Sequence, residues 1–518
     1  MILDLQTLER WLWDSADILR GSIDSSDYKN YIFGLLFLKR ANDVFDEEVE
    51  KIMETDGLSR REAEEERDYH QFYMPLSARW QTITGKTENI GEALDKAFAA
   101  VEEENPGLDI EGVMTAVHFG NKDVLNDAVL QRLLMHFNKY SLKNRDLYTP
   151  DLLGTAYEYL IKMFADDAGK KGGEFYTPKG VVSLLVNLIK PEPGNRVYDP
   201  TCGSGGMLIE SAGYIEEHYG KSGVHIDVSL YGQEKNLGTW AICKINMLFH
   251  NLTDAKIRKG DTLDNPKHVE KNELMVFDRV IANPPFSQVK WWDRAEVAVG
   301  KNENGKEIAP NYSKVVSDPF GRFSYGIPPR SYGDLAFLQH MIAVLKHRGK
   351  LGIVLPHGVL FRGSSEGRIR QGILEDDILE AVVGLPAKLF YNTGIPASIL
   401  IIAKNKPAAL KGRVVFIDAS REFKEGKNQN VLEEAHIEKI VTAYDGLADV
   451  DKFMRIVAMA EIVENDYNLN IARYIDTSEA EEPVDLEQTL EKISAVEEKE
   501  LEIDKRLGDY LRELGLKG

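Results

Sequence analysis

Apolar and polar positions alternate along the first 150 residues with the period of an α-helix. One apolar series, spaced three and four residues apart, consists of Leu5, Leu8, Trp11, Leu12 and Ala16. A second series consists of Tyr28, Tyr31, Ile32, Leu35, Leu36 and Leu38. We expect Asp27 to cap this second helix, Arg40 to end it, and the charged segment 53–67 to be a solvated helix or loop. The pattern predicts a helical N-terminal domain over residues 1–150.

From Tyr176 onward the pattern changes to strand, glycine-rich turn and helix. Short apolar runs that end at glycine, proline or a carboxylate predict buried parallel strands at 196–200, 228–234, 278–285, 350–356 and 380–386. Helical stretches such as 206–219 and 334–346 separate them. We therefore predict a doubly wound α/β domain over residues 151–455, interrupted by a long loop at 290–332 that is expected to be functional or mobile.

The tail returns to a helical pattern, and we predict a C-terminal helical region over residues 456–518. Its apolar positions, spaced three and four apart with one slip, are Leu486, Leu490, Ile493, Val496, Ile503, Leu507, Tyr510 and Leu514. Such a face suits either a helix of a partner protein or packing back against its own chain. Both alternatives stay open.

Length and charge limit what the chain can do by itself. At 518 residues it is too long for one ordinary core, so two or three domains are expected. Its 63 Lys and Arg against 84 Asp and Glu give a net charge of −21, which repels a phosphate backbone on average. Nucleic-acid binding must then be local to one face or shared with a basic partner.

Cysteine and histidine usage predicts no metal site. Two cysteines, Cys202 and Cys243, exclude a disulfide scaffold and a four-cysteine zinc site, and the histidines show no metal-ligand spacing. The first residues do not form a signal peptide, and no apolar run approaches the ~18 residues of a membrane span. We expect a cytoplasmic protein without membrane contact.

The sharpest chemical signal is Asn283-Pro284-Pro285-Phe286, at the end of a predicted strand. One interpretation is a turn stiffened by proline. The other is activation of a planar amine such as adenine N6, whose lone pair is delocalised into the ring. The Asn283 side-chain carbonyl and the Pro284 backbone carbonyl would accept the two amine hydrogens and localise the pair, and the prolines would fix both acceptors. Phe286 would stack on an extruded base.

A second signal is the glycine-rich turn 199–206, DPTCGSGG, where backbone N–H groups can approach a carboxylate at a helix N-terminus. It departs from the dinucleotide fingerprint because Leu208 stands where Gly or Ala is required. Glu234 ends the next strand and could accept both ribose hydroxyls, and Asp261 could accept from an adenine amino group. Either acid alone is also explained as a loop residue or N-cap. In this order they describe a pocket for an adenosine with a carboxylate tail, as in S-adenosylmethionine.

A third element is the segment 173–179, GEFYTPK, before a helix at 181–189. Thr177 followed by Pro178 has the residue types of an N-cap and a first helical position. The segment is either a lid over the methionine end of the cofactor, with Tyr176 as an apolar wall, or simply a capped helix start.

In sequence order, GEFYTP, DPTCGSG, YGQE, GDT and NPPF resemble the motifs of amino-group DNA methyltransferases. Longer strings, including YKNYIFGLLFLKR, YGIPPRSYGDLAFLQHMI and GIVLPHGVLFRG, are similar to the modification (M) subunit of type I restriction–modification systems. The resemblance runs over nearly the whole chain. It implies a Rossmann-like S-adenosylmethionine-dependent methyltransferase domain with a helical N-terminal domain and C-terminal helices.

The resemblance also implies roles for individual residues. Catalysis is expected from Asn283, Pro284, Pro285 and Phe286. Base stacking is expected from Phe286 and from Phe390 or Tyr391. Cofactor contacts are expected from Glu174, Phe175, Tyr176, Thr177, Pro178, Lys179, Asp199, Thr201, Gly203, Ser204, Gly205, Gly206, Glu234 and Asp261.

The function implied is methyl transfer from S-adenosylmethionine to adenine N6 in double-stranded DNA, by base flipping. The partners implied are a specificity (S) subunit that reads the DNA site, a second M subunit in an assembly of two M subunits with one S subunit, and motor/nuclease (R) subunits in the full complex. Two alternatives stay open at the level of sequence. The same tetrapeptide could methylate a protein glutamine or an RNA base, and the chain could bind the cofactor only as a scaffold without turnover.

Overall fold

The computed structural model describes residues 2–23, 27–148, 152–168, 176–220, 228–292, 318–390, 394–426, 429–477 and 486–514. The chain divides into two compact units, Met1–Ile475 and Asp476–Gly518. The described α-helices of the first unit are α1 Leu5–Leu19, α2 Tyr28–Asp56, α3 Arg60–Glu65, α4 Trp80–Thr84, α5 Ile90–Glu104, α6 Asp127–Phe137, α7 Leu152–Ala168, α8 Lys179–Ile189, α9 Gly206–Tyr219, α10 Leu237–Phe249, α11 Asp334–Ala343, α12 Ser364–Glu375, α13 Glu434–Gly446 and α14 Met459–Glu464. Its described strands are β1 Arg196–Asp199, β2 Ser229–Glu234, β3 Lys256–Lys259, β4 Val269–Glu270, β5 Glu273–Leu274, β6 Phe277–Ala282, β7 Leu345–Pro356, β8 Leu379–Gly384, β9 Ala397–Ala403, β10 Arg413–Asp418 and β11 Met454–Ala458.

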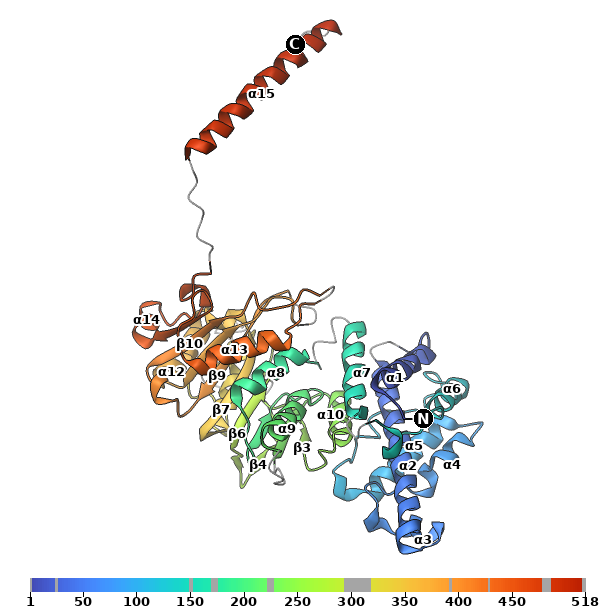
Figure 1. Cartoon of the computed structure of the whole chain (residues 1–518). Coiled ribbons are helices and arrows are strands. Elements are labelled where there is room, and N and C mark those ends of the chain that lie inside the picture. The colour runs from blue at the N-terminus through green and yellow to red at the C-terminus, as the bar shows by residue number, and fades with distance from the viewer. Residues whose placement is uncertain are drawn as a thin grey trace, which may run out of the picture. The chain divides into compact units, whose positions relative to one another are not determined.

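The N-terminal residues form helices, as predicted. Figure 1 shows α1, α2, α4, α5 and α6 gathered beside the sheet, with α7 and α10 between that group and the strands. The second helix does not end at Arg40 but continues to Asp56, because the apolar spacing goes on through buried Phe45 and Val49. Asp27 stands at its start without a side-chain capping bond, so the predicted cap is wrong in its chemistry.

The large sheet has nine described strands in the order β11-β10-β8-β9-β7-β6-β1-β2-β3. Strands β3, β2, β1, β6 and β7 are parallel, and β9 and β11 run antiparallel to their neighbours. After β1 the chain moves outward to β2 and β3, and it then returns to the other side of β1 with β6. The carboxyl ends of β1 and β6 therefore form a topological switch point, where open α/β sheets bind ligands.

Both faces of the sheet are buried, which explains the continuous apolar runs of the strands. Consecutive residues of β6 face opposite cores. Val280 and Ala282 belong to the buried cluster that contains residues of α11 and α12, whereas Ile281 belongs to the cluster that contains residues of α8 and the N-terminal helices. A one-residue shift of register would therefore exchange the two cores.

Five predicted strands correspond to β1, β2, β6, β7 and β8, and the predicted doubly wound α/β class is confirmed in a mixed sheet. The predicted helix 334–346 is too long: α11 ends at Ala343 and β7 already begins at Leu345. The reason is tertiary, because Leu345 pairs with Phe277 and the backbone carbonyl of Val344 accepts the Phe277 N–H.

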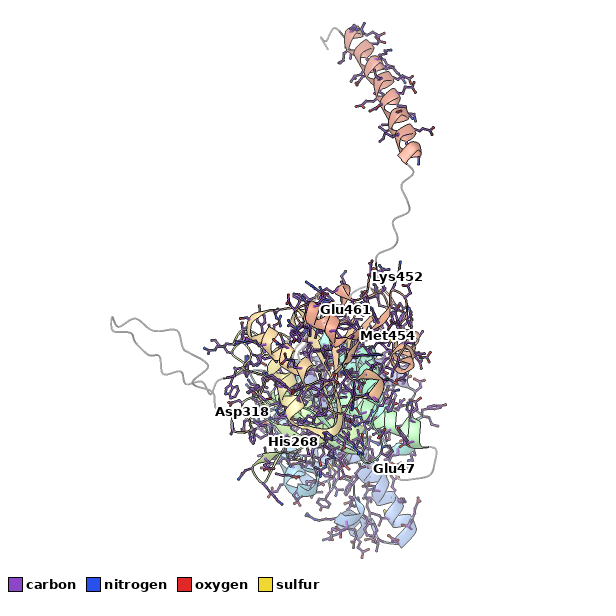
Figure 2. All side chains as sticks on the ribbon, turned by 90° about the vertical axis from the view of Figure 1, so that its left-hand side faces the viewer. Glu47, His268, Asp318, Lys452, Met454 and Glu461 are labelled. Atoms are coloured by element: carbon purple, nitrogen blue, oxygen red, sulfur yellow. The ribbon has the colours of Figure 1, made fainter. Side chains whose placement is uncertain are left out.

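A buried ion pair lies between α11 and the turn after β3. Asp318, labelled in Figure 2, holds the guanidinium of Arg322, which also donates to the carbonyls of Thr262 and Leu263 and to Nδ1 of His340. The side chains of Asp318 and Arg322 are 5% and 1% exposed. Because each nitrogen of this guanidinium has an acceptor, the network fixes the chain after 317 to the loop that carries Asp261.

The second unit contains α15, Leu486–Glu513, which confirms the predicted helix in the tail. The domain limits at 150 and 455 stay predictions. Among the described helices, none is long and apolar enough to cross a bilayer.

Candidate active site

Three sequence signals meet at one edge of the sheet. The glycine turn follows β1, Glu234 ends β2 and Asn283 follows β6, and these three strands are adjacent and parallel. Parallel strands bring their carboxyl ends to the same edge. Residues that are up to 84 positions apart in sequence, from Asp199 to Asn283, therefore surround one region.

The turn between β1 and α9 needs its glycines. Gly203 and Gly205 have φ angles of 53° and 88°, in the left-handed region that favours glycine. A Cβ on Gly205 would lie 2.3 Å from Cε of Met247 and 2.9 Å from Sγ of Cys243. Gly205 therefore brings the turn close to α10 and lines neither of the cavities described below, whereas Gly203 and Gly206 line one of them.

Two carboxylates lie beside this turn. Asp199 is 2% exposed, and Oδ1 accepts the Thr201 N–H at 2.9 Å. Burial, with a smaller contribution from the Glu234 charge, raises the pKa of Asp199 to about 8. Glu234 accepts the N–H groups of Gly203 at 3.1 Å and Asn236 at 2.7 Å. Burial also raises the pKa of Glu234, although these backbone bonds oppose the rise.

The Asn283 side chain has one satisfied end and one unsatisfied end. Its Nδ2 donates to the hydroxyl of Thr177 at 3.0 Å, which fixes the orientation of the amide. Its Oδ1 is buried and has no hydrogen-bond partner among the described residues. A buried carbonyl without a partner costs free energy, and a hydrogen-bond donor on a ligand would remove that cost.

Thr177 does not cap α8. The helix begins at Lys179, and Pro178 stands at the N-cap position without a side-chain bond, so the predicted capping register is wrong by one residue. The Thr177 hydroxyl instead accepts a hydrogen bond from the side-chain amide of Asn283, which lies 106 positions away in the sequence. Thr177 therefore orients the side-chain amide of Asn283 and does not cap α8.

The Asp261 carboxylate already has hydrogen-bond and ion-pair partners within the protein, which the sequence did not indicate. Oδ1 accepts the N–H groups of Leu263 at 2.9 Å and Asp264 at 3.2 Å, and Oδ2 pairs with Nζ of Lys235 at 2.8 Å. The side chain of Lys235 is 65% exposed, so this ion pair is open to exchange with a ligand.

Two cavities lie on either side of the turn, and both reach Asn283 and Thr201. The smaller one, about 220 Å³, is lined among the predicted residues by Tyr176, Thr177, Lys179, Asp199, Thr201, Gly203, Ser204, Gly206 and Asn283. The larger one, about 820 Å³, is lined among them by Thr201, Glu234, Asp261, Asn283 and Pro285. Most of the described cofactor-site predictions therefore line these two cavities, which share Thr201 and Asn283, whereas Pro178, Gly205, Pro284, Phe286 and Phe390 line neither.

The predicted stacking residues touch each other. The rings of Phe286 and Phe390 meet edge to face, with their centroids 5.5 Å apart. Pro284 and Phe390 are buried, and Phe286 is half-buried. Tyr391, Glu174 and Phe175 lie outside the described residues.

Two models of known families match the chain. The model described as N-6 DNA Methylase matches residues 148–483, and the HsdM N-terminal domain model matches residues 8–137. The chain belongs to the N-6 DNA methylase family. The predicted resemblance to type I modification subunits and the predicted enzyme class, a DNA adenine methyltransferase, are confirmed by this membership and by the relatives that follow.

Several relatives of this N-6 DNA methylase are described as methylase subunits of type I restriction enzymes. The type I restriction enzyme MjaVII methylase subunit of Methanocaldococcus jannaschii is 36% identical over 94% of this chain and 81% of its own length. The HindI methylase subunit of Haemophilus influenzae is 32% identical over 84% of this chain and 99% of its own. A solved methyltransferase subunit of a type I restriction–modification system from Streptococcus thermophilus has a TM-score of 0.75 at 33% identity, covering 92% of this chain and 100% of that one.

Sequence reasoning missed a second group of residues in this N-6 DNA methylase. Asp334, which is 0% exposed, accepts the Ser287 N–H at 2.7 Å and pairs with Arg362 at 2.8 Å. Ser287 follows the tetrapeptide directly and has a φ of 52°. Asp334 thus fixes the backbone just after Phe286. The only sequence signal was GDLAF in the longer family string, which gave no role to the acid.

Residues of the N-terminal helices were missed as well. Glu9 of α1 lines the smaller cavity, and Lys29 and Asn30 of α2 line the larger one. No motif marks them, because their place depends on how the helical region packs against the sheet.

Proposed function

We propose that this chain transfers the methyl group of S-adenosylmethionine to N6 of adenine in double-stranded DNA. The observation that carries the proposal is the buried Oδ1 of Asn283, unpartnered among the described residues, at the meeting point of two cavities. An acceptor without a donor at this position suits an amine that arrives with the substrate. Membership of the N-6 DNA methylase family supports DNA adenine over the RNA and protein alternatives.

The residues present fit the methyl donor. The N-terminus of α9, whose first residue Gly206 lines the smaller cavity, suits the donor's carboxylate, and buried Asp199 suits its amino group. Glu234 ends β2 in the larger cavity, where it suits the ribose hydroxyls. S-adenosylmethionine, when bound, supplies an electrophilic methyl group on a sulfonium.

The chain's own part in the chemistry is to prepare the amine. Oδ1 of Asn283 and the backbone carbonyl of Pro284 accept one amine hydrogen each and draw the nitrogen towards tetrahedral geometry. Thr177 holds the amide in the required orientation, and the two prolines fix the backbone before the substrate arrives. No general base is required during transfer, because the methylated nitrogen loses its proton afterwards.

Adenine N6 is inaccessible inside a duplex, so we propose that the target base is flipped out. Phe286 and Phe390 provide an aromatic surface on which it stacks, and Tyr391, the next residue in the sequence, stays a predicted member of that surface. Unpairing costs on the order of a few kcal/mol, which these contacts and those of the partners must offset.

We propose that the subunit works in the cytoplasm within a type I complex. A net charge of −21 disfavours independent reading of a long DNA site, so sequence choice belongs to a separate specificity subunit. A second modification subunit, together with one specificity subunit, completes the methyltransferase, and motor/nuclease subunits complete the restriction enzyme. The apolar stripe along α15 suits contact with the specificity subunit.

The test is Asn283→Ala in the chain co-expressed with its specificity subunit. We expect methylation of DNA to fall by at least about 10²-fold, as for loss of a transition-state acceptor. Affinity for S-adenosylhomocysteine in calorimetry should persist. The control is Asn465→Ala, whose rate should be unchanged. Asn465 follows α14, next to the edge strand β11 in the sequence.

Near wild-type methylation by Asn283→Ala would contradict the amine-activation account. Transfer of labelled methyl groups to RNA or to protein glutamine, but not to DNA, would overturn the substrate. Binding of the donor without any transfer, even with the specificity subunit present, would indicate a scaffold.

A further inference from the structure

The larger cavity has walls from two regions of the chain. On one side it is lined by Glu234, Asp261 and Asn283 at the strand ends, and on the other by Lys29 and Asn30 in the first turn of α2. The proposed function places the adenosine part of the donor beside Glu234. A ligand there faces α2 across the cavity.

Ion pairs join the helical N-terminal region to the sheet domain. Asp109, after α5, pairs with Nζ of Lys244 at 3.0 Å and with Arg258 of β3 at 3.2 Å. The side chain of Lys244 is only 5% exposed, so this cation depends on Asp109 for its charge partner. The two regions belong to one compact unit.

Apolar contacts strengthen the same junction. The rings of Phe37 in α2 and Phe249 in α10 lie 6.3 Å apart between centroids, and the hydroxyl of Tyr157 in α7 donates to the carbonyl of Ile242 at 3.2 Å. Helix α10 therefore packs between α7, α2 and the sheet. Through α10, these contacts join α2 to the sheet.

Asn30 is the residue with suitable chemistry and position. A Cβ on Gly238 would lie 3.5 Å from Oδ1 of Asn30, so the amide of Asn30 lies against the first turn of α10. This turn begins at Asn236, whose N–H donates to Glu234. The Asn30 amide is half-buried and carries both a donor and an acceptor. It lies beside Gly238, which follows Glu234, the carboxylate expected to hold the ribose, by four residues in the sequence.

We propose that Asn30 is a ligand-binding residue for the adenosine part of the methyl donor, contributed by the helical N-terminal region. This inference rests on the proposed function for the identity of the donor. It adds that the helical region forms part of the donor site and is not only a platform for DNA or partner subunits.

The test compares Asn30→Ala with wild type in the full chain by calorimetry. We expect S-adenosylhomocysteine to bind about tenfold more weakly, the loss typical of one hydrogen bond. Binding of 5′-methylthioadenosine, which lacks the amino-acid end, should weaken by the same factor. Lys51→Ala, an exposed change on the same helix, should leave both affinities unchanged.

Three outcomes decide the matter. Unchanged S-adenosylhomocysteine affinity in a folded Asn30→Ala protein overturns the inference and leaves the proposed function standing. A loss seen with S-adenosylhomocysteine but not with 5′-methylthioadenosine also overturns it, because Asn30 would then act at the wrong end of the ligand. Failure of the wild-type protein to bind either ligand overturns the donor assignment itself, and the inference with it.

Discussion

Asp199 shows how a buried charge can link ligand binding to pH. Burial raises the pKa of this carboxyl to about 8, so it is mostly protonated in the ligand-free protein at pH 7. The proposed donor carries an amino cation, which favours the ionised carboxylate. Binding at pH 7 should therefore release a proton from Asp199, and affinity should rise with pH until about 8.

This proton release is measurable by calorimetry. S-adenosylhomocysteine titrated at pH 7 in two buffers of different ionisation enthalpy should give heats that differ by the equivalent of up to one proton. Asp199→Asn removes the titrating group and should abolish that part of the difference. The same difference in wild type and Asp199→Asn would show that the proton comes from another group.

Thr177 and Asn283 show where residue-level prediction stops. Local sequence alone favours Thr177 as a helix cap, because residue types are compared only with their neighbours in the chain. Its hydroxyl instead accepts from an amide 106 positions away. The strand before Asn283 was predictable from its apolar run, but the partner of the Asn283 side chain was not.

Among the elements, the strands were predictable wherever both faces are buried. Strands β1, β2 and β6 appear in the sequence as short apolar runs before turns, and their shared edge follows from parallel pairing. Strand β9, Ala397–Ala403, is just as apolar and fully buried, but its antiparallel direction depends on fitting between β7 and β8. Which elements are neighbours across the sheet is not encoded in any local pattern.

Asp334, the first residue of α11, should affect the methylation rate because it anchors the backbone after Phe286. Asp334→Ala removes the acceptor of the Ser287 N–H and one partner of Arg362, which keeps Glu366. A buried N–H without an acceptor costs about 1–3 kcal/mol, and the backbone after Phe286 should become less ordered. We expect a single-turnover methylation rate at least about tenfold lower, with S-adenosylhomocysteine affinity retained.

Asp334→Asn is the matched comparison, since its carbonyl oxygen can still accept from Ser287 while the charge is lost. Its rate should lie between those of wild type and Asp334→Ala. Equal rates for Asp334→Ala and wild type, at equal thermal stability, would mean that the loop after the tetrapeptide does not need this anchor.

At the scale of the whole molecule, stability should depend on buried histidines. His340 accepts a hydrogen bond from Arg322 at Nδ1 and is 1% exposed, and burial and the Arg322 charge hold its pKa well below the usual value. His268, labelled in Figure 2, bonds to the Gly232 carbonyl, and burial lowers its pKa as well. Both side chains are neutral in the folded protein at neutral pH.

Because these two histidines are buried in their neutral form, acid should destabilise the fold. Below about pH 6.5 the unfolded chain binds protons at these histidines and the folded chain does not, so stability falls as pH decreases. At pH 5.5 the loss from His340 is at most about 1.4 kcal/mol, the limit for a side chain that stays neutral in the folded protein. Urea midpoints measured from pH 7.5 to 5.5 should show this slope, and His340→Gln should reduce it. Exposed His347→Gln is the control, and a slope that is the same for His340→Gln would contradict the assignment.

The ion pairs of Asp109 join the helical region to the sheet domain. Because Glu9, Lys29 and Asn30 line the two cavities together with residues of the sheet domain, the cavities belong to the whole first unit. Predicting them required the packing of distant segments, which no motif contains.

The edge-to-face contact of Phe286 with Phe390 bears on which acceptors can be used. A small free nucleoside reaching this place would have to wedge the two rings apart with no anchorage elsewhere. A nucleotide within a polymer is held by its flanking phosphates, so the work of separation is shared along the strand. Discrimination against the cell's large supply of free adenine compounds would then need no dedicated filter.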